Sequence, residues 1–184
     1  MKPGTIVYQG KSRSGKEIIF RYPTEDDLKS LWEYINKISK EKTFITFQGE
    51  EMTLEGEQKW LEAELQKITA GKAVQVLVFS DNKLVGVSGI SMKERAEKHV
   101  GIFGITIAKD FRKDGIGVLL METVLKEARK NLKELKIVTL GVFGNNPVAQ
   151  KLYKKMGFAE YGNLPKGAVH RGVPVDHIYM FKKV

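Results

Sequence analysis

The residues best placed to do chemistry lie in one short glycine-containing segment, Arg112-Lys113-Asp114-Gly115-Ile116-Gly117. An apolar run rich in isoleucine precedes this segment, and apolar residues at helical spacing follow it. The first N–H groups of a helix have no partner within the helix and carry the positive end of its dipole, so they attract anions. Glycine has no Cβ atom, which lets a phosphate approach the backbone closely. The segment therefore predicts a phosphate-binding turn, with Arg112 and Lys113 adding positive charge.

The elements around this turn decide its meaning, because R-x-x-G-x-G alone is also typical of an ordinary turn. Residues 100–108 predict a buried strand and residues 116–132 an amphipathic helix, the context that an anion site requires. A dinucleotide-binding fingerprint would need another glycine where Leu120 stands. A Walker loop would need a lysine and a hydroxyl where Val118 and Leu119 stand. Both of these phosphate motifs are therefore excluded at this position.

A second segment near the N-terminus imitates a phosphate motif. Gly10-Lys11-Ser12-Arg13-Ser14-Gly15-Lys16 fits G-x-x-x-x-G-K, but Glu17 replaces the required hydroxyl residue. The alternating residues 5–9 and 18–22 on its two sides predict strands rather than a helix. The segment is therefore expected to be the turn of a β-hairpin.

Composition sets the limits of function. The chain has 184 residues, 42% of them hydrophobic and 29% charged, as expected for one globular domain. It contains no apolar run of membrane-spanning length, and its N-terminus has no apolar segment of the signal-peptide kind, so a cytoplasmic protein is expected. The absence of cysteine excludes disulfides and thiolate chemistry, and three scattered histidines make a metal site improbable.

A net charge of +9 raises the question of a nucleic-acid partner. The lysines, however, are interleaved with glutamates, as in the segment KEARKNLKELK. This pattern is typical of a solvated helix face with i,i+4 ion pairs. A polyanionic cofactor would explain part of the excess equally well, so a basic nucleic-acid-binding module is the less favoured interpretation.

The remaining periodicity predicts a mixed α/β (α+β) protein with helices on the faces of one sheet. Residues 42–52, between the first two helices, could be a simple connector or a substrate-facing loop, and the two interpretations are equally favoured. The loop ends in the acidic pair Glu50 and Glu51. The expected strands are 5–9, 18–22, 73–80, 84–92, 100–108, 137–143, 159–164 and 174–181, and the expected helices are 24–38, 53–68, 116–132 and 147–156.

A second motif connects this pattern with a known family. Asn146, Ala149, Leu152, Tyr153, Gly157 and Phe158 fit N-x-x-A-x-x-L-Y-x-x-x-G-F, and RKDGIG fits a Q/R-x-x-G-x-G/A pyrophosphate loop. With both motifs in this order, the chain from about Ile18 onward resembles the GNAT superfamily of acetyl-CoA-dependent N-acetyltransferases. Members that modify protein N-termini, such as the ribosomal-protein alanine acetyltransferases, are the most similar. Small-amine and amino-acid acetyltransferases share the same motifs.

The resemblance implies a fold and a reaction. The fold would be a single N-acetyltransferase domain over residues 1–184, with residues 1–17 as a hairpin extension. Its sheet would be mixed and mostly antiparallel, with a splay between two central strands. The reaction would be transfer of an acetyl group from acetyl-CoA to a primary amine, by direct attack of the amine. The resemblance also allows a homodimer, and it implies no membrane partner.

The resemblance also assigns roles to residues. The pantetheine arm would lie along residues 105–107, and the N–H of Ile107 would stabilise the developing oxyanion. Tyr153 would be the general acid for the departing thiolate, although a core aromatic is the alternative interpretation of this residue. No metal is implied. The residues implied to contact acetyl-CoA are Ile105, Thr106, Ile107, Arg112, Lys113, Asp114, Gly115, Ile116, Gly117, Val118 and Asn146.

One position departs from the pattern. The ribosomal-protein acetyltransferases carry a glutamate base on the strand before Asn146, and the matching residue here is Gly141. The acceptor amine therefore stays open, and a non-catalytic acyl-CoA-binding protein is a second interpretation. The base must then lie elsewhere, act through water, or be unnecessary if the amine arrives neutral. The candidates for a base are Glu50, Glu51, Glu94 and Asp176, and a surface charge is the favoured interpretation of each.

Overall fold

The computed structural model describes residues 1–184, and its elements follow the expected order. None of the helices is both long and apolar enough to cross a membrane. The helices are α1 (Leu28–Lys40), α2 (Leu54–Thr69), α3 (Ile116–Asn131) and α4 (Pro147–Lys155). The strands are β1 (Ile6–Lys11), β2 (Glu17–Arg21), β3 (Ala73–Ser80), β4 (Lys83–Met92), β5 (Val100–Ile107), β6 (Ile137–Phe143), β7 (Ala159–His170) and β8 (Val173–Lys183).

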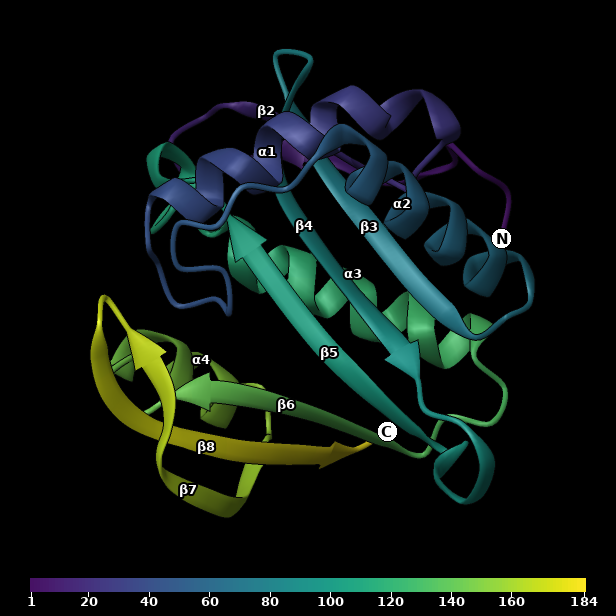
Figure 1. The fold of residues 1–184 in the computed structure, drawn as a ribbon. Helices are drawn as coiled ribbons and strands as arrows, with labels where there is room; N and C mark the ends of the chain where they lie inside the picture. The colour runs from purple at the N-terminus through teal and green to yellow at the C-terminus, as the bar shows by residue number, and fades with distance from the viewer.

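One eight-stranded sheet runs in the order β1-β2-β3-β4-β5-β6-β8-β7, and only β5 and β6 are parallel neighbours. Helices α1 and α2 cover one face over β3 and β4, whereas α3 lies behind the same strands and α4 lies behind β6 and β8 (Figure 1). This arrangement confirms the expected mixed, mostly antiparallel sheet with flanking helices. It leaves the face of β6, β8 and β7 on the α1–α2 side without a helical cover.

The core lies between the sheet and α3. Its main cluster contains 26 buried residues, among them Ile116, Leu120 and Val124 of α3. These residues follow the i, i+4, i+8 spacing of one helix face, and they pack against Val74, Val76 and Val78 on one face of β3. Hydrophobic burial on this side fixes α3, and with it the turn at the N-terminus of α3, against β5.

Helix α1 differs from the expectation at its start. Residues Glu25–Asp27 form a 3-10 turn before the α-helix begins at Leu28. The carboxylate of Asp27 accepts a hydrogen bond from the Thr24 N–H at 2.7 Å and pairs with Arg21. Burial alone would raise the pKa of Asp27, but the hydrogen bonds from Arg21 and Thr24 hold it below its usual value. The carboxylate accepts the Thr24 N–H, and the Asp27 N–H closes the tight turn onto the Thr24 oxygen, so the α-helix starts later than residue 24.

The last two strands are longer than expected. The sequence predicts strands at 159–164 and 174–181, but β7 continues to His170 through an irregularity between Leu164 and Ala168. The segment Pro165-Lys166-Gly167 imitates a turn and is instead a bulge, which explains the early stop in the prediction. The true turn is at Arg171 and Gly172, whose φ values of 54° and 79° match the two central residues of a type I′ turn.

The parallel pair β5–β6 opens after three residue pairs. Pairing runs from Val100↔Ile137 to Ile102↔Thr139 and then ends, although β5 continues to Ile107 and β6 to Phe143. Figure 1 shows the two strands diverging from this point. The expected splay between two central strands is therefore present, and it leaves one side of β5 without a partner strand.

Candidate active site

A cavity of about 510 Å³ lies at the splay, where the end of β5 meets the start of α3. It brings together residues that are far apart in the sequence, from the 43–45 loop, from β5 and from α4. Asp114 and Ile116 do not line it. The residues expected to contact acetyl-CoA or to act as acid that do line it are Ile105, Thr106, Ile107, Arg112, Lys113, Gly115, Gly117, Val118, Asn146 and Tyr153.

The edge of β5 in this cavity offers backbone groups to a ligand. The N–H of Ala108 donates to the Val85 oxygen of β4 at 2.9 Å, and Ile107 lies opposite Gly86. Because hydrogen-bonded and non-bonded pairs alternate along an antiparallel ladder, Ile105 and Ile107 direct their N–H and C=O groups away from β4. They point toward β6, which has already diverged. An extended ligand can therefore add to β5 as a strand would.

The N-terminus of α3 forms the other wall of the cavity. Gly115 precedes the helix with φ of 81°, and Lys113 has φ of 62°, so the chain turns sharply into a 16-residue helix. A Cβ atom placed on Gly117 would meet no atom within 4 Å. Open space over exposed helical N–H groups is what an anion site requires. Lys113 makes no ion pair in the protein, so its charge remains available to a ligand.

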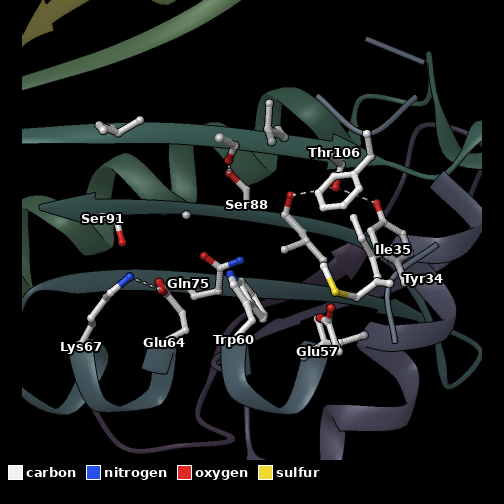
Figure 2. Close-up of a pocket in the computed structure, with 18 residues that line it drawn as sticks. Tyr34, Ile35, Glu57, Trp60, Glu64, Lys67, Gln75, Ser88, Ser91 and Thr106 are labelled. Carbon is white, nitrogen blue, oxygen red and sulfur yellow. Dashed lines mark hydrogen bonds and ion pairs between the residues drawn. The ribbon is translucent and has the colours of Figure 1, made fainter. Parts of the chain in front are cut away.

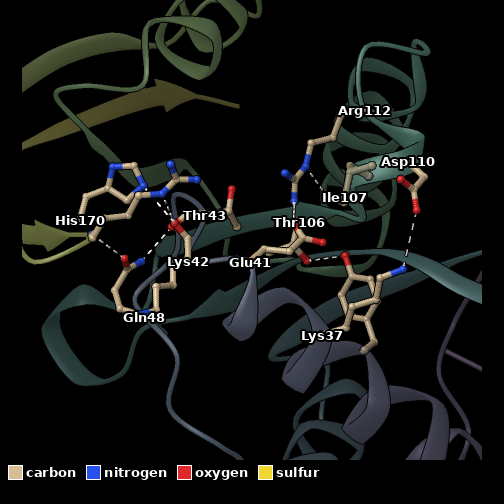
Figure 3. Close-up of polar contacts among 12 residues, drawn as sticks. Lys37, Glu41, Lys42, Thr43, Gln48, Thr106, Ile107, Asp110, Arg112 and His170 are labelled. Carbon is tan, nitrogen blue, oxygen red and sulfur yellow. Dashed lines mark hydrogen bonds and ion pairs between the residues drawn. The ribbon is translucent and has the colours of Figure 1, made fainter.

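Arg112 does not serve as a free cation. Its guanidinium donates to the Ile107 oxygen at 2.8 Å and forms an ion pair with Glu41 at the end of α1 (Figure 3). The charge of Arg112 is therefore largely neutralised by Glu41 before any phosphate arrives. The side chain ties α1 to the last residue of β5, which fixes the strand edge. The expectation that Arg112 adds charge to the turn is corrected to this positioning role.

Asp114 points away from the cavity, toward the N-terminal hairpin. Its carboxylate accepts hydrogen bonds from the N–H and the hydroxyl of Ser14, both at 2.6 Å. The backbone carbonyl of Asp114 accepts the Arg13 N–H. The Ser14 hydrogen bonds hold the pKa of Asp114 below its usual value. The segment that imitates a Walker loop is thus a hairpin turn that supports the α3 turn. The side chains of Asp114 and of the buried Ile116 therefore do not face the cavity.

Tyr153 of α4 is a buried aromatic residue that also lines the first cavity. Its ring is 8% exposed and packs edge-on to Phe103, with 6.3 Å between ring centroids. Its hydroxyl lines the cavity and makes no hydrogen bond in the protein. Burial raises the pKa of Tyr153 to about 12, so the hydroxyl keeps its proton at neutral pH. A buried aromatic ring therefore holds a protonated donor at the cavity.

Asn146 starts the helix that carries Tyr153. Its Oδ1 accepts the Ala149 N–H at 3.2 Å, which caps α4, and Pro147 follows at the first helical position. The amide NH₂ of Asn146 remains free at the cavity wall. Asn146 is therefore first a helix cap, and its amide can also reach a ligand.

A second cavity of about 410 Å³ lies on the α1–α2 side of the sheet. It shares Ile105 and Thr106 with the first cavity, so the two meet at the end of β5. The Tyr34 hydroxyl of α1 donates to the Thr106 Oγ1 at 3.0 Å at this junction (Figure 2). Two substrates bound in the two cavities would approach each other here.

The loop between α1 and α2 lines both cavities and crosses to the C-terminal strands. Phe44 lines the first cavity and Phe47 the second. At its start the Lys42 oxygen contacts the His170 ring, and the Gln48 side chain accepts the N–H of the turn residue 171 at 3.0 Å (Figure 3). The loop is therefore both a connector and a cavity wall, so neither interpretation drawn from the sequence was complete.

None of the carboxylates proposed as a base lies in either cavity. Glu50 accepts a hydrogen bond from the N–H of its own loop residue Gln48, and Glu51 faces the outer side of α1. Asp176 is held by Asn163 and by the N–H of residue 166. Glu94 precedes a 3-10 turn beyond β4 and lines neither cavity. This placement agrees with the interpretation of all four carboxylates as surface charges.

The carboxylates that do line the second cavity are Glu57 and Glu64 of α2. The sequence pattern does not predict them, because the apolar residues of α2 place Trp60 on the buried face. In the structure Trp60 is partly exposed and the two glutamates are buried. At Gly141, the imidazole of His177 fills the space, since a Cβ there would lie 2.3 Å from its Nε2. Burial lowers the pKa of His177. Only the seven-residue spacing of the two glutamates could have revealed a shared face.

No group of three or more His, Cys, Asp or Glu side chains is arranged to hold a metal ion.

A comparison with protein families shows which family this fold and these motifs belong to. Residues 32–158 match the acetyltransferase (GNAT) family. The chain belongs to this family. The assignment confirms the family expected from the two sequence motifs, and with it the acyltransferase enzyme class.

Individual relatives agree with the GNAT assignment. The chain is 33% identical over 107 residues to the L-amino acid N-acetyltransferase AaaT of Escherichia coli K12, a match that covers 58% of this chain and 65% of that relative. It superposes on a GNAT-family acetyltransferase from Streptococcus pneumoniae with a TM-score of 0.82 and 27% identity, over 91% of this chain and all of that one. The yncA protein of Salmonella typhimurium, a putative acetyltransferase solved with acetyl-CoA, gives a TM-score of 0.77 at 15% identity, over 90% of this chain and 93% of that one.

Proposed function

We propose that this GNAT protein transfers the acetyl group of acetyl-CoA to a primary amine by direct attack of the amine. The observation that carries the proposal is the first cavity, which combines a free strand edge, an open helix N-terminus and the Tyr153 hydroxyl. A thioester substrate with a pantetheine arm and a pyrophosphate needs these three features. The acetyl-CoA-bound yncA structure supports the same use of this fold.

Each part of the cavity has a defined task in this proposal. The unpaired edge of β5 binds the pantetheine amides, and the N–H groups from Lys113 to Val118 bind the pyrophosphate. The N–H of Ile107 donates to the thioester oxygen as negative charge develops on it. Arg112 and its partner Glu41 fix this N–H in position, since Arg112 holds the carbonyl of the same residue.

The chemical steps balance without a protein nucleophile. The amine nitrogen, once deprotonated, forms a bond to the thioester carbon, and the carbon–sulfur bond breaks. The Tyr153 hydroxyl donates its proton to the departing thiolate sulfur and recovers one from the nitrogen of the tetrahedral adduct. The products are an N-acetyl amide and free CoA thiol. No residue of the protein is acylated.

The acceptor in this proposal is a small molecule rather than a protein N-terminus. The strand position used by the ribosomal enzymes is Gly141, and the relative named above acts on L-amino acids. The second cavity has the size of a small-molecule site. The absence of cysteine fits a reducing compartment, so a cytoplasmic location is part of the proposal.

Two measurements test the proposed function. Calorimetry with acetyl-CoA is expected to show binding that weakens when the Gly117 turn is blocked. A thiol reporter with amino acids, diamines and a peptide bearing a free N-terminus is expected to show amine-dependent CoA release. Binding of acetyl-CoA without CoA release by any amine would instead identify a non-catalytic acyl-CoA-binding protein.

A further inference from the structure

The inner face of α2 presents charged side chains to the second cavity. Glu57 is 4% exposed and Glu64 is 5% exposed, and both line the cavity. Their offset of seven positions spans two helical turns, so their backbones lie about 10 Å apart on one face. Trp60 lies between them on the same face, and Lys67 lies one turn beyond Glu64.

Glu57 has no partner within the protein. No hydrogen bond or ion pair reaches its carboxylate, and burial raises its pKa. A buried carboxylate without a partner destabilises the fold, so its presence needs another reason. Because the side chain borders a cavity at the junction with the cofactor site, a cationic ligand is the partner that fits it.

The order of the side chains gives the cavity a direction. Figure 2 shows Glu57 at the same end as Tyr34 and Thr106, and Glu64 with Lys67 and Ser91 toward the opposite end. Thr106 is shared with the first cavity, so its end is where an acetyl group would arrive. The ammonium that Glu57 holds is therefore the one that reacts.

The middle and the far end define the rest of the ligand. Trp60 lies between Glu57 and Glu64, and the apolar side chains of Met52 and Ile102 also line the cavity, which suits a methylene chain. At the far end the Lys67 Nζ lies 3.3 Å from the Glu64 Oε2, so a positive and a negative group stand side by side. A ligand end that carries both charges is the complement of this pair.

We propose that the second cavity binds an α,ω-diamino acid such as lysine, with its side-chain ammonium on Glu57 and its α-ammonium and α-carboxylate on Glu64 and Lys67. The inference rests on the proposed acetyl transfer and names its acceptor class. Glu57 is then a catalytic residue, and Glu64 and Lys67 determine specificity. The reaction product is the ω-N-acetyl amino acid.

The proton balance assigns a second task to Glu57. Its carboxylate takes one proton from the ω-ammonium, which frees the nitrogen lone pair for attack on the thioester carbon. The carboxyl group then releases this proton to solvent, while Tyr153 protonates the sulfur. Only the ionised carboxylate can perform this step, so kcat/KM is expected to rise with pH as Glu57 loses its proton.

The other polar groups that face this cavity come from α1, α2 and the strands. From α2 the cavity receives Glu64, already paired with Lys67, and from α1 it receives the Tyr34 hydroxyl. The strands contribute only uncharged side chains, of which the polar ones are Gln75, Ser88, Ser91 and Thr106. Burial raises the pKa of Tyr34, so this hydroxyl stays protonated.

The first test compares ligands that lack one charge each. Lysine is compared with 1,5-diaminopentane, which lacks the carboxylate, with 6-aminohexanoate, which lacks the α-ammonium, and with norleucine, which lacks the ω-amine. Lysine is expected to exceed each in kcat/KM by about tenfold or more, the usual value of one charged contact. The product is expected to carry acetyl on the ω-nitrogen, which mass spectrometry of fragments identifies.

The second test uses variants with a matched control. Glu57→Gln is expected to lower kcat/KM for lysine by about a hundredfold and to flatten its acidic limb, because the proton acceptor is lost. Lys67→Met is expected to abolish the preference for lysine over 1,5-diaminopentane. Glu64→Gln is expected to abolish the preference over 6-aminohexanoate. Glu62→Gln on the exposed face of α2 is the control and is expected to change none of these values.

The outcomes separate the inference from the proposed function. Acetylation of norleucine at a rate equal to lysine, or of lysine at its α-nitrogen, would leave amine acetylation intact and overturn the diamino-acid site. An acidic limb that persists in Glu57→Gln and disappears in His177→Asn would overturn the role of Glu57. If CoA is released with none of the amines, the proposed acetyl transfer is wrong. Calorimetry of lysine with the CoA-saturated protein then tests whether the second cavity binds a diamino acid. Binding that Glu57→Gln weakens about tenfold supports the site, and absence of binding overturns it.

Discussion

The two cavities that meet at Thr106 differ in the kind of polar group that they present to a ligand. The cavity at the splay offers a ligand mainly backbone polar groups, namely the free edge of β5 and the N–H groups at the start of α3. The cavity under α1 and α2 presents side chains, with Glu57, Glu64 and Lys67 as its charged groups. Backbone sites bind what every member of a family shares, and side-chain sites are free to vary with the acceptor.

The difference also governs what a substitution can do. A backbone donor cannot be removed by mutation, so the first cavity is broken only by filling it or by deleting its one reactive side chain. The second cavity can be altered charge by charge. Variants in the first cavity should therefore change the use of acetyl-CoA, and variants in the second cavity should change the use of the amine.

The largest effect in the first cavity is expected for Tyr153→Phe. The substitution removes one hydroxyl and keeps the ring that packs on Phe103, so stability should change little. If the hydroxyl protonates the departing thiolate, kcat should fall by roughly a hundredfold. The measurement is kcat under saturating acetyl-CoA with a thiol reporter, together with the acetyl-CoA Kd, which should hardly change.

The alternative for Tyr153 predicts the reverse ranking. A purely structural ring would give a small loss of thermal stability and a nearly normal kcat. A decrease of less than about threefold would remove the hydroxyl from the mechanism. Protonation by water would then have to suffice.

The next largest effect is expected for Gly117→Glu. The added side chain enters open space over the N-terminus of α3 and brings a negative charge to the proposed pyrophosphate site. The acetyl-CoA Kd should rise by at least tenfold, or about 1.4 kcal/mol. Calorimetry measures it, and Gly117→Ala is the control, because a methyl group meets no atom there. An unchanged Kd in Gly117→Glu would move the phosphate site elsewhere.

Much of this first cavity could be predicted from the sequence, because its parts obey local rules. The left-handed turn needs glycine at 115, the helix needs an apolar stripe, and α4 needs a cap such as Asn146 followed by Pro147. Each of these features acts within a few residues of itself. The order of strands and helices along the chain, and the family, could therefore also be predicted from the sequence.

The second cavity could not be predicted in the same way. Its side chains come from α1, α2 and three strands, and no local pattern shows that Glu57 and Tyr34 face one another. Long-range pairing likewise decided the roles of Arg112, which is tied to Glu41, and of Asp114, which is tied to Ser14. Charge and hydrogen bonding between distant segments redirected residues whose types alone suggested ligand binding.

Gly104→Leu should show the opposite separation from Gly117→Glu. Gly104 lines only the second cavity, and a Cβ placed on it would meet no atom within 4 Å, so the larger side chain fills the cavity without disturbing the sheet. The KM of the amine should rise by about tenfold, because the cavity can no longer hold its methylene chain. The acetyl-CoA Kd should stay within about twofold of the wild-type value. Equal losses for both substrates would show that the two cavities are one site.

The smallest effect is expected for the double substitution Glu50→Gln and Glu51→Gln. Both carboxylates belong to the α1–α2 loop, but neither lines a cavity, and Glu50 accepts a hydrogen bond from the Gln48 N–H that a glutamine oxygen can also accept. At physiological ionic strength, charges outside a cavity are screened within about 8 Å. The amine KM should therefore change by less than about twofold, and acetyl-CoA binding should not change. A tenfold increase in the amine KM, which the sequence alone allowed for this acidic pair, would instead place the acceptor against the outer loop and would leave the buried carboxylate of Glu57 without a ligand.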